Sequence, residues 1–350
     1  MDKNRKRAAF EDITNAKGLQ VENSFNAQPP LQQYKNPVFA GGLQDVLALR
    51  MGNVGLDGTQ TTSSCGLPEA AACDIDSPDM EDALCCAEIA SEIFSNLRRA
   101  ELRRRPATNY MEVVQADINP LMRSILVDWL VEVAQEYRMC SDTLFLAVAF
   151  VDRYLSLRSV PRSQLQLVGV ACMWVASKYE EIYPPSVDDY AYITDHTYSR
   201  TQLANAERDV LATLSFDLTQ PTAKTFLRRY VKAAAAELDL TYTFEHLTAY
   251  LLELTLLDYS CLGYLPSMVA ASTVLLALYT LDYRPWTATL SRYTGYSPRS
   301  LRHCAQAINE LALASPTSQL PATREKYASS RQLQVSRIAM PSSLPDYIFQ

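Results

Sequence analysis

Two long stretches without a charged side chain constrain the fold of this chain more than any other feature. The first runs from Ser163 through Ser177, and the second runs from Leu265 through Leu281, about 100 residues further on. Each is long enough for about four helical turns. Apolar residues recur at three- and four-residue steps in the segments on either side of both stretches. Because a helix that is apolar all round must be buried, we predict two central helices, each surrounded by amphipathic ones.

The amphipathic segments follow the same order in both halves of the chain. The clearest one begins after Asn119-Pro120, where asparagine favours the N-cap and proline favours the first helical position. Similar cap signals occur at Ser141, at Ser199-x-x-Gln202 and at Ser297-Pro298. The predicted helices span residues 120–137, 141–155, 163–181, 187–193 and 199–216, and then 221–238, 244–259, 265–281, 286–293 and a last one from residue 297. The fold class is therefore all-α, with two tandem five-helix bundles.

The domain organisation follows from a change in amino-acid composition and hydrophobic pattern near residue 80. Residues 1–80 are rich in Gln, Asn, Gly, Ser, Pro and Asp and show no sustained helical period. Such a segment buries too little apolar surface to offset its ordering entropy, so we expect a disordered tail. A helix from Leu84 to Ala100 is expected before the first bundle. The expected units are 1–80, 84–218 and 219–340.

Composition excludes several functional classes. Seven of the ten glycines precede residue 67, so the predicted bundles have no Gly-rich phosphate loop. The net charge of −7 argues against nucleic-acid or membrane binding through bulk charge. The basic, then polar N-terminus lacks the apolar stretch of a secretory signal. The uncharged run Tyr259–Leu281 could span a membrane by length, but we interpret it as a buried core helix.

No residue pattern points to catalysis, a metal or a cofactor. The three histidines (His196, His246 and His303) lack a nucleophile or metal-ligand setting, and the eight cysteines include no Cys-x-x-Cys pair. We expect reduced cysteines that act as small core residues. The acidic pairs Glu180-Glu181 and Asp188-Asp189 are interpreted as solvated faces. An interaction protein is favoured over an enzyme.

Nine short sequence words resemble those of the cyclin family. They occur in order and with few gaps between about residues 84 and 340, and their detail is similar to A-type cyclins, plant-like ones in particular. The words are Met122–Val133, Asp152–Leu155, Leu165–Gly169, Ala176–Pro185, Tyr192–Asp195, Pro221-Thr222, Leu254–Asp258, Leu265–Ala271 and Arg324–Tyr327. The resemblance implies tandem five-helix bundles, which the periodicity predicts independently. It also implies a regulatory subunit, without catalysis of its own, that activates a cyclin-dependent serine/threonine kinase in S phase, G2/M and mitosis.

The resemblance also implies a kinase-binding surface. Lys178 and Glu207 would form its polar core, and Tyr179, Ile182 and Phe216 would be apolar anchors beside them. The alternative from spacing alone is that Lys178 is solvated and pairs with Glu181. The anchors would then be ordinary core residues. The helix from Leu84 to Ala100 would also lie against the kinase.

A second implied site takes Arg-x-Leu peptides from substrates and inhibitors. Its apolar stripe lies on the helix that begins at Pro120, and a carboxylate there would pair with the basic residue of the peptide. The implied residues are Met122, Ile125, Leu126, Trp129, Glu132, Arg162 and Gln166. Ser124 replaces the usual alanine and should be tolerated. The alternative is that the stripe belongs to the core.

The tail carries a motif similar to a destruction box, which a ubiquitin ligase would recognise. Arg7, Ile13 and Asn15 match the motif, whereas Phe10 stands where leucine is usual. The basic cluster Lys3, Arg5, Lys6 and Arg7 is compatible with nuclear import. We expect residence in the nucleus, with the cytoplasm as a second location.

Two rival functions remain at this stage. A general transcription factor of the TFIIB type also uses tandem cyclin-like bundles, but it would show a basic face and an N-terminal zinc ribbon. Net charge and cysteine spacing argue against it. An all-α enzyme would show a cluster of titratable residues, which the sequence does not display.

Overall fold

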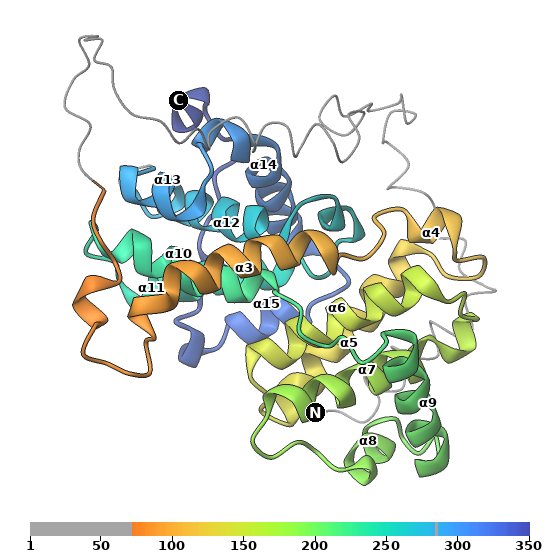
Figure 1. Cartoon of the computed structure of the whole chain (residues 1–350). Coiled ribbons are helices and arrows are strands. Elements are labelled where there is room, and N and C mark those ends of the chain that lie inside the picture. The colour runs from red at the N-terminus through yellow and green to blue at the C-terminus, as the bar shows by residue number, and fades with distance from the viewer. Residues whose placement is uncertain (1–71, 284–285) are drawn as a thin grey trace, which may run out of the picture. The chain divides into compact units, whose positions relative to one another are not determined.

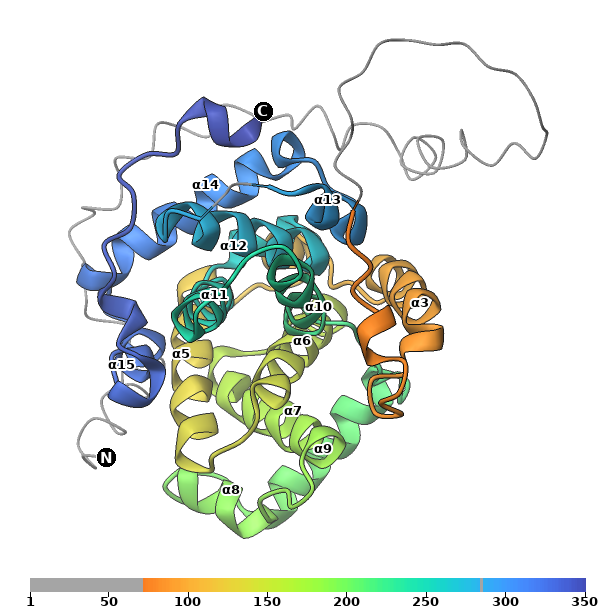
Figure 2. The same cartoon turned by 90° about the vertical axis from the view of Figure 1, so that its left-hand side faces the viewer.

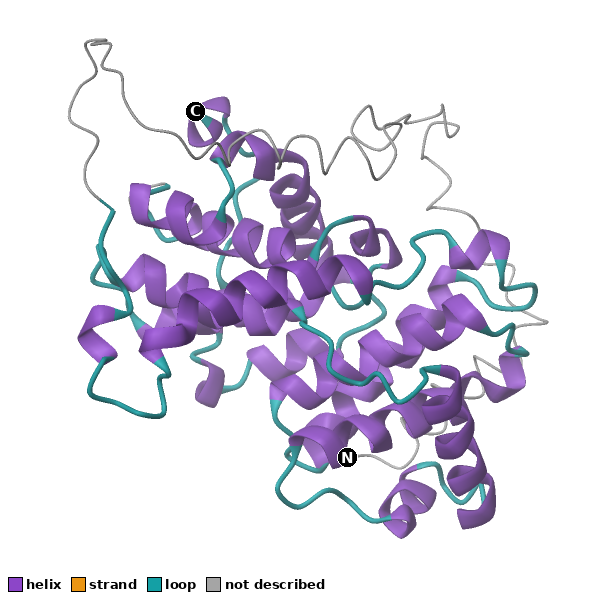
Figure 3. Cartoon of the chain, viewed as in Figure 1, coloured by secondary structure: helices purple, strands orange, loops and turns teal. Residues whose placement is uncertain are grey.

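This computed structural model describes residues 72–283 and 286–350, in which two groups of helices are each arranged around a central helix (Figure 1). Within these ranges the regular structure is helical and contains no strand (Figure 3). The first group comprises α4 (Tyr110–Val113), α5 (Pro120–Glu136), α6 (Ser141–Leu157), α7 (Leu165–Glu180), α8 (Val187–Ile193) and α9 (Arg200–Thr213). The second comprises α10 (Ala223–Ala235), α11 (Tyr242–Leu254), α12 (Pro266–Thr280), α13 (Ala288–Thr294), α14 (Pro298–Ala314) and α15 (Ala322–Tyr327). Helix α3 (Ala90–Arg103) precedes both.

The two central helices are α7 and α12, as the uncharged stretches predict. From Leu165 through Ser177, every residue of α7 except Leu167 is buried. Gly169 permits close packing of α5 on α7, since a Cβ there would lie 2.6 Å from Cδ1 of Leu126. In α12, eleven residues are buried. No helix in the described part of the chain is long and apolar enough to cross a membrane.

Most predicted helix starts are confirmed, and the reason is visible in the caps. The side chain of Asn119 accepts a hydrogen bond from Met122 N at 2.9 Å. Ser199 and Gln202 form the predicted capping box. Ser141 is different: it is the first residue of α6, and Cys140 occupies the N-cap without a side-chain cap bond. A contact from outside the helix holds this start instead, because Glu181 accepts hydrogen bonds from Cys140 N and from the Thr143 hydroxyl.

Both ends of the second group extend further than predicted. Residues 73–80 were expected in the disordered tail, but Ile75 is 2% exposed and packs in the second core. The boundary at residue 80 was therefore wrong. At the other end, predicted at residue 340, Ile348 and Phe349 are also buried in this core. Single apolar residues in polar segments give no periodic signal, so the sequence pattern missed these contacts.

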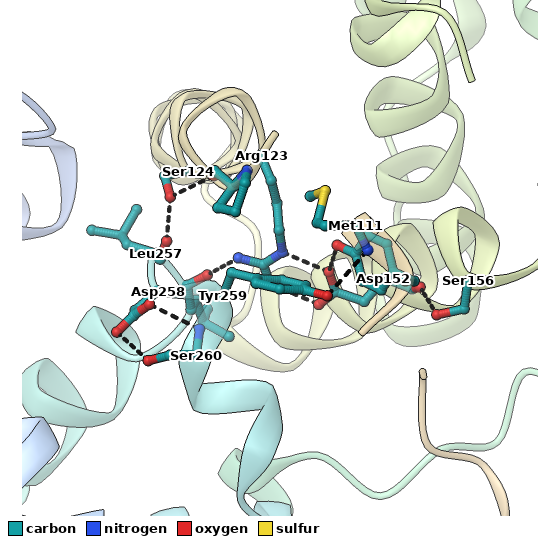
Figure 4. Close-up of polar contacts among 12 residues, drawn as sticks. Met111, Arg123, Ser124, Asp152, Ser156, Leu257, Asp258, Tyr259 and Ser260 are labelled. Atoms are coloured by element: carbon teal, nitrogen blue, oxygen red, sulfur yellow. Dashed lines mark hydrogen bonds and ion pairs between the residues drawn. The ribbon is translucent and has the colours of Figure 1, made fainter. Parts of the chain in front are cut away.

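A buried polar cluster joins the two groups of helices (Figure 4). The Arg123 guanidinium on α5 donates to both oxygens of Asp152 on α6, at 2.6 and 2.7 Å. It also donates to the carbonyl of Leu256, which follows α11, at 2.9 Å. Nearby, the hydroxyl of Ser124 donates to the carbonyl of Leu257 at 2.6 Å. Side chains of the first group thus satisfy backbone carbonyls of the second.

Candidate functional site

The structure brings Lys178 and Glu207 together on the surface of the first helix group. Lys178 lies in the last turn of α7 and Glu207 on α9, with Nζ and Oε1 2.6 Å apart. The Lys178 ammonium also lies 3.6 Å from the ring centroid of Trp174, one turn earlier. The side chain of Lys178 is 41% exposed and that of Glu207 is 17% exposed. A contact from outside can therefore reach this charged pair.

The alternative partner, Glu181, is engaged elsewhere. Its Oε1 accepts hydrogen bonds from Cys140 N at 2.7 Å and from the Thr143 hydroxyl at 2.5 Å. Glu181 therefore holds the start of α6 against the end of α7. This arrangement supports the pairing of Lys178 with Glu207 over the pairing that spacing alone favoured.

The three predicted apolar anchors are surface residues. Tyr179, Ile182 and Phe216 are 46, 87 and 68% exposed, so the interpretation of them as core residues is wrong. Tyr183, which directly follows Ile182, is 91% exposed and was not among the predicted anchors. Its position before Pro184 and Pro185 was the available signal, because such a segment cannot continue the helix. Together with Lys178 and Glu207, these four residues form what we call the anchor surface.

The end of α9 determines where the Phe216 ring points. Ser215 and Phe216 both adopt left-handed backbone conformations, with φ of 54° and 57°. The Phe216 N–H closes the turn on the carbonyl of Leu211 at 2.9 Å. A left-handed conformation is costly for a bulky residue, and such strain clusters at functional sites. The helix was predicted to reach Phe216, but it ends at Thr213 because this turn stops it.

Helix α3 adjoins the anchor surface through the linker between the two helix groups. The Tyr179 hydroxyl lies 2.9 Å from the hydroxyl of Thr219 in this linker. Arg104, at the C-cap of α3, pairs with Asp217 at 2.8 Å and also donates to the Thr219 carbonyl. Ile89, just before α3, is 50% exposed, and on α3 itself Ile93 is 37% exposed and Leu102 is 45% exposed. The helix predicted to accompany the anchor residues is therefore beside them.

The other side of α3 is fixed to the second helix group. Glu101 is 3% exposed and accepts hydrogen bonds from Ser267 N at 3.0 Å and from the Ser267 hydroxyl at 2.8 Å. Burial raises the pKa of this carboxyl. Arg229 on α10 lies over the ring of Phe94, 4.5 Å from its centroid, and Figure 2 shows α3 beside α10. The position of α3 is thus determined by buried contacts.

The predicted docking stripe is mostly part of the core. Met122, Leu126 and Trp129 are 7, 0 and 4% exposed and pack in the first core. The expectation of an exposed groove formed by these three residues is wrong, because the helices around α5 cover the same face that the apolar pattern marks. Ile125, a member of the same predicted stripe, is only half-buried.

The polar residues predicted around this stripe differ in accessibility. Glu132 is half-buried and Gln166 is 7% exposed. Arg162 is accessible and pairs with Asp117, with Nε and Oδ1 2.8 Å apart. Ile125, Glu132 and Arg162 are therefore the members of the predicted set that a peptide could contact without opening the core.

Other predicted features have mixed outcomes. Cys172, Cys261 and Cys304 are buried free thiols, as predicted, whereas Cys73, Cys85, Cys86 and Cys140 are exposed.

Among the described residues there is no group of three metal-ligating side chains. The destruction-box residues Arg7, Phe10, Ile13 and Asn15, and the basic cluster beside them, lie outside the described residues.

The comparison with family profiles decides the identity of this architecture. The profile described as "Cyclin, N-terminal domain" matches residues 92–219, and the one described as "Cyclin, C-terminal domain" matches residues 221–341. The chain belongs to the cyclin family. The resemblance drawn from the nine sequence words is confirmed.

Curated relatives of this cyclin include plant A-type cyclins. It is 47% identical over 281 residues to Cyclin-A1-1 of Oryza sativa subsp. japonica, covering 79% of this chain and 55% of the relative. It is 40% identical over 342 residues to Cyclin-A2-2 of Arabidopsis thaliana, covering 97% of this chain and 78% of the relative. The chain spans little more than half the length of the rice relative.

A solved structure shares the fold. A viral cyclin from herpesvirus saimiri matches with a TM-score of 0.58 and 22% identity, over 66% of this chain and 98% of the viral one. The all-α prediction with two tandem bundles is therefore confirmed both by the helices of the described residues and by a cyclin fold determined experimentally.

Proposed function

We propose that this cyclin is a regulatory subunit that binds and activates a cyclin-dependent serine/threonine kinase in control of the cell cycle. The chain contributes no catalytic residue in this proposal; the kinase supplies ATP, magnesium and phosphoryl transfer. The observation that carries the proposal is the anchor surface. It combines an accessible ion pair with four exposed aromatic or aliphatic side chains at or just after the ends of α7 and α9, and the linker that follows contacts the C-cap of α3.

The chemistry of the anchor surface suits a protein partner. Exposed aromatic and aliphatic side chains gathered in one place mark interaction sites, and aromatic residues dominate binding energy at interfaces. The Lys178 ammonium can donate to backbone carbonyls of a partner, and the Glu207 carboxylate can accept from backbone amides. Binding there would favour the active arrangement of the kinase by differential affinity for it.

The test is kinase activation by the purified full chain. The double variant Lys178→Ala/Glu207→Ala removes both charges together, so no unpaired charge is left behind. We expect at least a tenfold loss of histone phosphorylation by a panel of cyclin-dependent kinases, with an unchanged melting temperature. Arg200→Ala/Asp188→Ala is the matched control, because that pair joins α9 to α8 and both side chains are more than half exposed. Full activation by the Lys178/Glu207 variant would refute the role of the anchor surface.

We further propose that substrates and inhibitors with Arg-x-Leu motifs dock beside α5. Glu132 is the carboxylate of the predicted set and would pair with their arginine, and half-buried Ile125 offers apolar surface to their leucine. Since Met122, Leu126 and Trp129 are core residues, peptide binding there requires side-chain adjustment around Ile125.

For the tail, we propose recognition by a ubiquitin ligase through Arg7, Phe10, Ile13 and Asn15. We also propose residence in the nucleus, with the cytoplasm as a second location. The support is the sequence: a motif similar to a destruction box and four basic residues among the first seven. Replacing Lys3, Arg5, Lys6 and Arg7 by glutamine in a fluorescent fusion should lower the nuclear fraction. An unchanged distribution would assign import to another segment or to the kinase partner.

A further inference from the structure

Residues Cys73–Met80, which we call the strap, are bound to the second helix group ahead of α3. The Cys73 N–H donates to the hydroxyl of Thr289 at 2.8 Å, and the Ile75 N–H donates to the hydroxyl of Tyr293 at 3.2 Å. The Ile75 side chain is 2% exposed in the second core. One buried apolar side chain and a few polar contacts therefore hold this short segment.

Two basic residues of α10 under the strap are paired with its carboxylates. Arg229 donates to both carboxylate oxygens of Asp76, at 2.9 and 2.6 Å, and is 7% exposed. Lys232 pairs with Asp79. Two cations thus face two anions, and the strap carries one further carboxylate, Asp74, beyond these pairs.

Ser77 lies at the centre of these charges and is exposed. Its hydroxyl donates to Asp74 Oδ2 at 2.6 Å. The other oxygen of Asp74 accepts from Asp76 N at 2.9 Å and from Ser77 N at 3.3 Å. These hydrogen bonds, that of the Ser77 hydroxyl first, lower the pKa of Asp74 to about 2. The Ser77 hydroxyl is therefore one of three protein donors to the Asp74 carboxylate.

Ser77 is also followed by proline, and its setting differs from that of the other Ser-Pro pairs in the described residues. Ser315, before Pro316, is 7% exposed, and its hydroxyl lies 2.7 Å from that of Tyr250. Ser297, before Pro298, is the N-cap of the long helix α14. By contrast, Ser77 opens the three-residue 3-10 helix Ser77–Asp79, which contains no buried residue. Local opening of so short an element costs little, so a kinase could reach this serine.

We propose that Ser77 is a phosphorylation site for a proline-directed serine/threonine protein kinase, and that the phosphoryl group releases the strap. The Ser77 hydroxyl oxygen attacks the γ-phosphorus of Mg-ATP, the bond from this phosphorus to the β–γ bridging oxygen breaks, and ADP leaves. The hydroxyl proton passes to the catalytic base of the kinase. The products are phosphoserine and ADP.

The electrostatic consequence follows from the contacts of the strap. Phosphorylation removes one of the three donors to Asp74 and adds about −1.5 to −2 charges beside that carboxylate. Arg229 is already paired with Asp76, and Lys232 is already paired with Asp79. The phosphate is therefore repelled by the carboxylates of the strap, and neither of these two cations is unpaired to neutralise it. The strap then loses its contacts with α10 and α13, and Ile75 leaves the core.

The first part of the test maps the site. The full chain is incubated with Mg-ATP and a purified mitogen-activated protein kinase, a proline-directed enzyme that is not the partner under Proposed function. Success or failure here is therefore independent of activation through the anchor surface. Peptide mass mapping should find phosphate at Ser77, absent from Ser77→Ala and retained in the matched control Ser297→Ala. Lack of phosphate at Ser77 in the folded chain would overturn the assignment.

The second part measures the strap itself. Hydrogen exchange of the Ile75 and Asp76 amides should become at least tenfold faster in the phosphorylated chain. Ser77→Ala treated in the same way should show no change caused by the kinase. If exchange is unchanged or slower when every chain carries a phosphate at Ser77, the proposed release of the strap is wrong. The phosphate would then pair with Lys232 or with Arg292, which also interacts with Asp74.

Discussion

Arg123 and Asp152 form a bidentate ion pair with both side chains 2% exposed, and the Tyr110 hydroxyl donates to the same carboxylate at 2.8 Å. The pair lies where the first helix group meets the carbonyl of Leu256 in the second. It therefore fixes the relation between α5, α6 and the segment that follows α11.

Asp152→Asn should destabilise the protein strongly. The variant leaves the Arg123 guanidinium buried without its counter-charge, which costs about 3–5 kcal/mol in comparable buried pairs. Denaturant unfolding measures the difference. Asp117→Asn is the matched control, because its partner Arg162 is accessible and exposed pairs contribute about 0–1 kcal/mol. Equal losses in the two variants would show that burial does not determine the cost.

Gly169→Ala should destabilise the first helix group by about 1–3 kcal/mol, since overpacking a core has this cost. The added Cβ would lie 2.6 Å from Cδ1 and 3.0 Å from Cδ2 of Leu126, which is fully buried. The same substitution in a Leu126→Ala background should cost less, because the clashing atoms are gone. Urea unfolding of the four proteins in this cycle provides the coupling energy. Strictly additive effects would contradict the close contact.

Glu101 should make stability fall as pH rises. Burial raises the folded-state pKa of this carboxyl above its ordinary 4.5, so the folded state binds more protons than the unfolded state above that pH. Stability contributed by the protonated group is present below about 4.5 and is lost as pH rises through the folded pKa. As the pH rises, the unfolding free energy of the natural chain should therefore fall relative to that of Glu101→Gln. A pH-independent difference would contradict a raised pKa.

The docking proposal predicts weaker peptide binding when the accessible residues change. A fluorescent Arg-x-Leu peptide should lose at least tenfold in affinity for Glu132→Gln and for Ile125→Ser, measured by polarisation. Leu121→Ser is the control, because Leu121 is 61% exposed on the first turn of the same helix. Trp129→Ala should also remove binding, but its loss of core packing requires a parallel measurement of stability. Equal affinity of all these proteins would refute the site.

The tail proposal predicts that deleting residues 1–20 prolongs the lifetime of the protein in mitotic extract without changing kinase activation. Arg7→Ala/Phe10→Ala in the full chain should have the same effect if the motif is the recognised feature. Immunoblotting over time measures both. Equal decay of the truncated and full-length chains would place the degron elsewhere.

By itself, the sequence determined the all-α fold, the two central helices and most helix starts. Uncharged helical runs must be buried, and caps such as Asn119 and Ser199 act within a few residues, so both signals are local. Those signals did not distinguish core from surface for Tyr179, Ile182 and Phe216, which the family resemblance assigned to an interface. Only the tertiary structure showed that these side chains are exposed while Met122, Leu126 and Trp129 are buried. It also decided that Lys178 pairs with Glu207 on α9, because Glu181 is held by the start of α6. Such choices depend on contacts between residues far apart in the chain, and no periodicity within one helix encodes which neighbour will cover it.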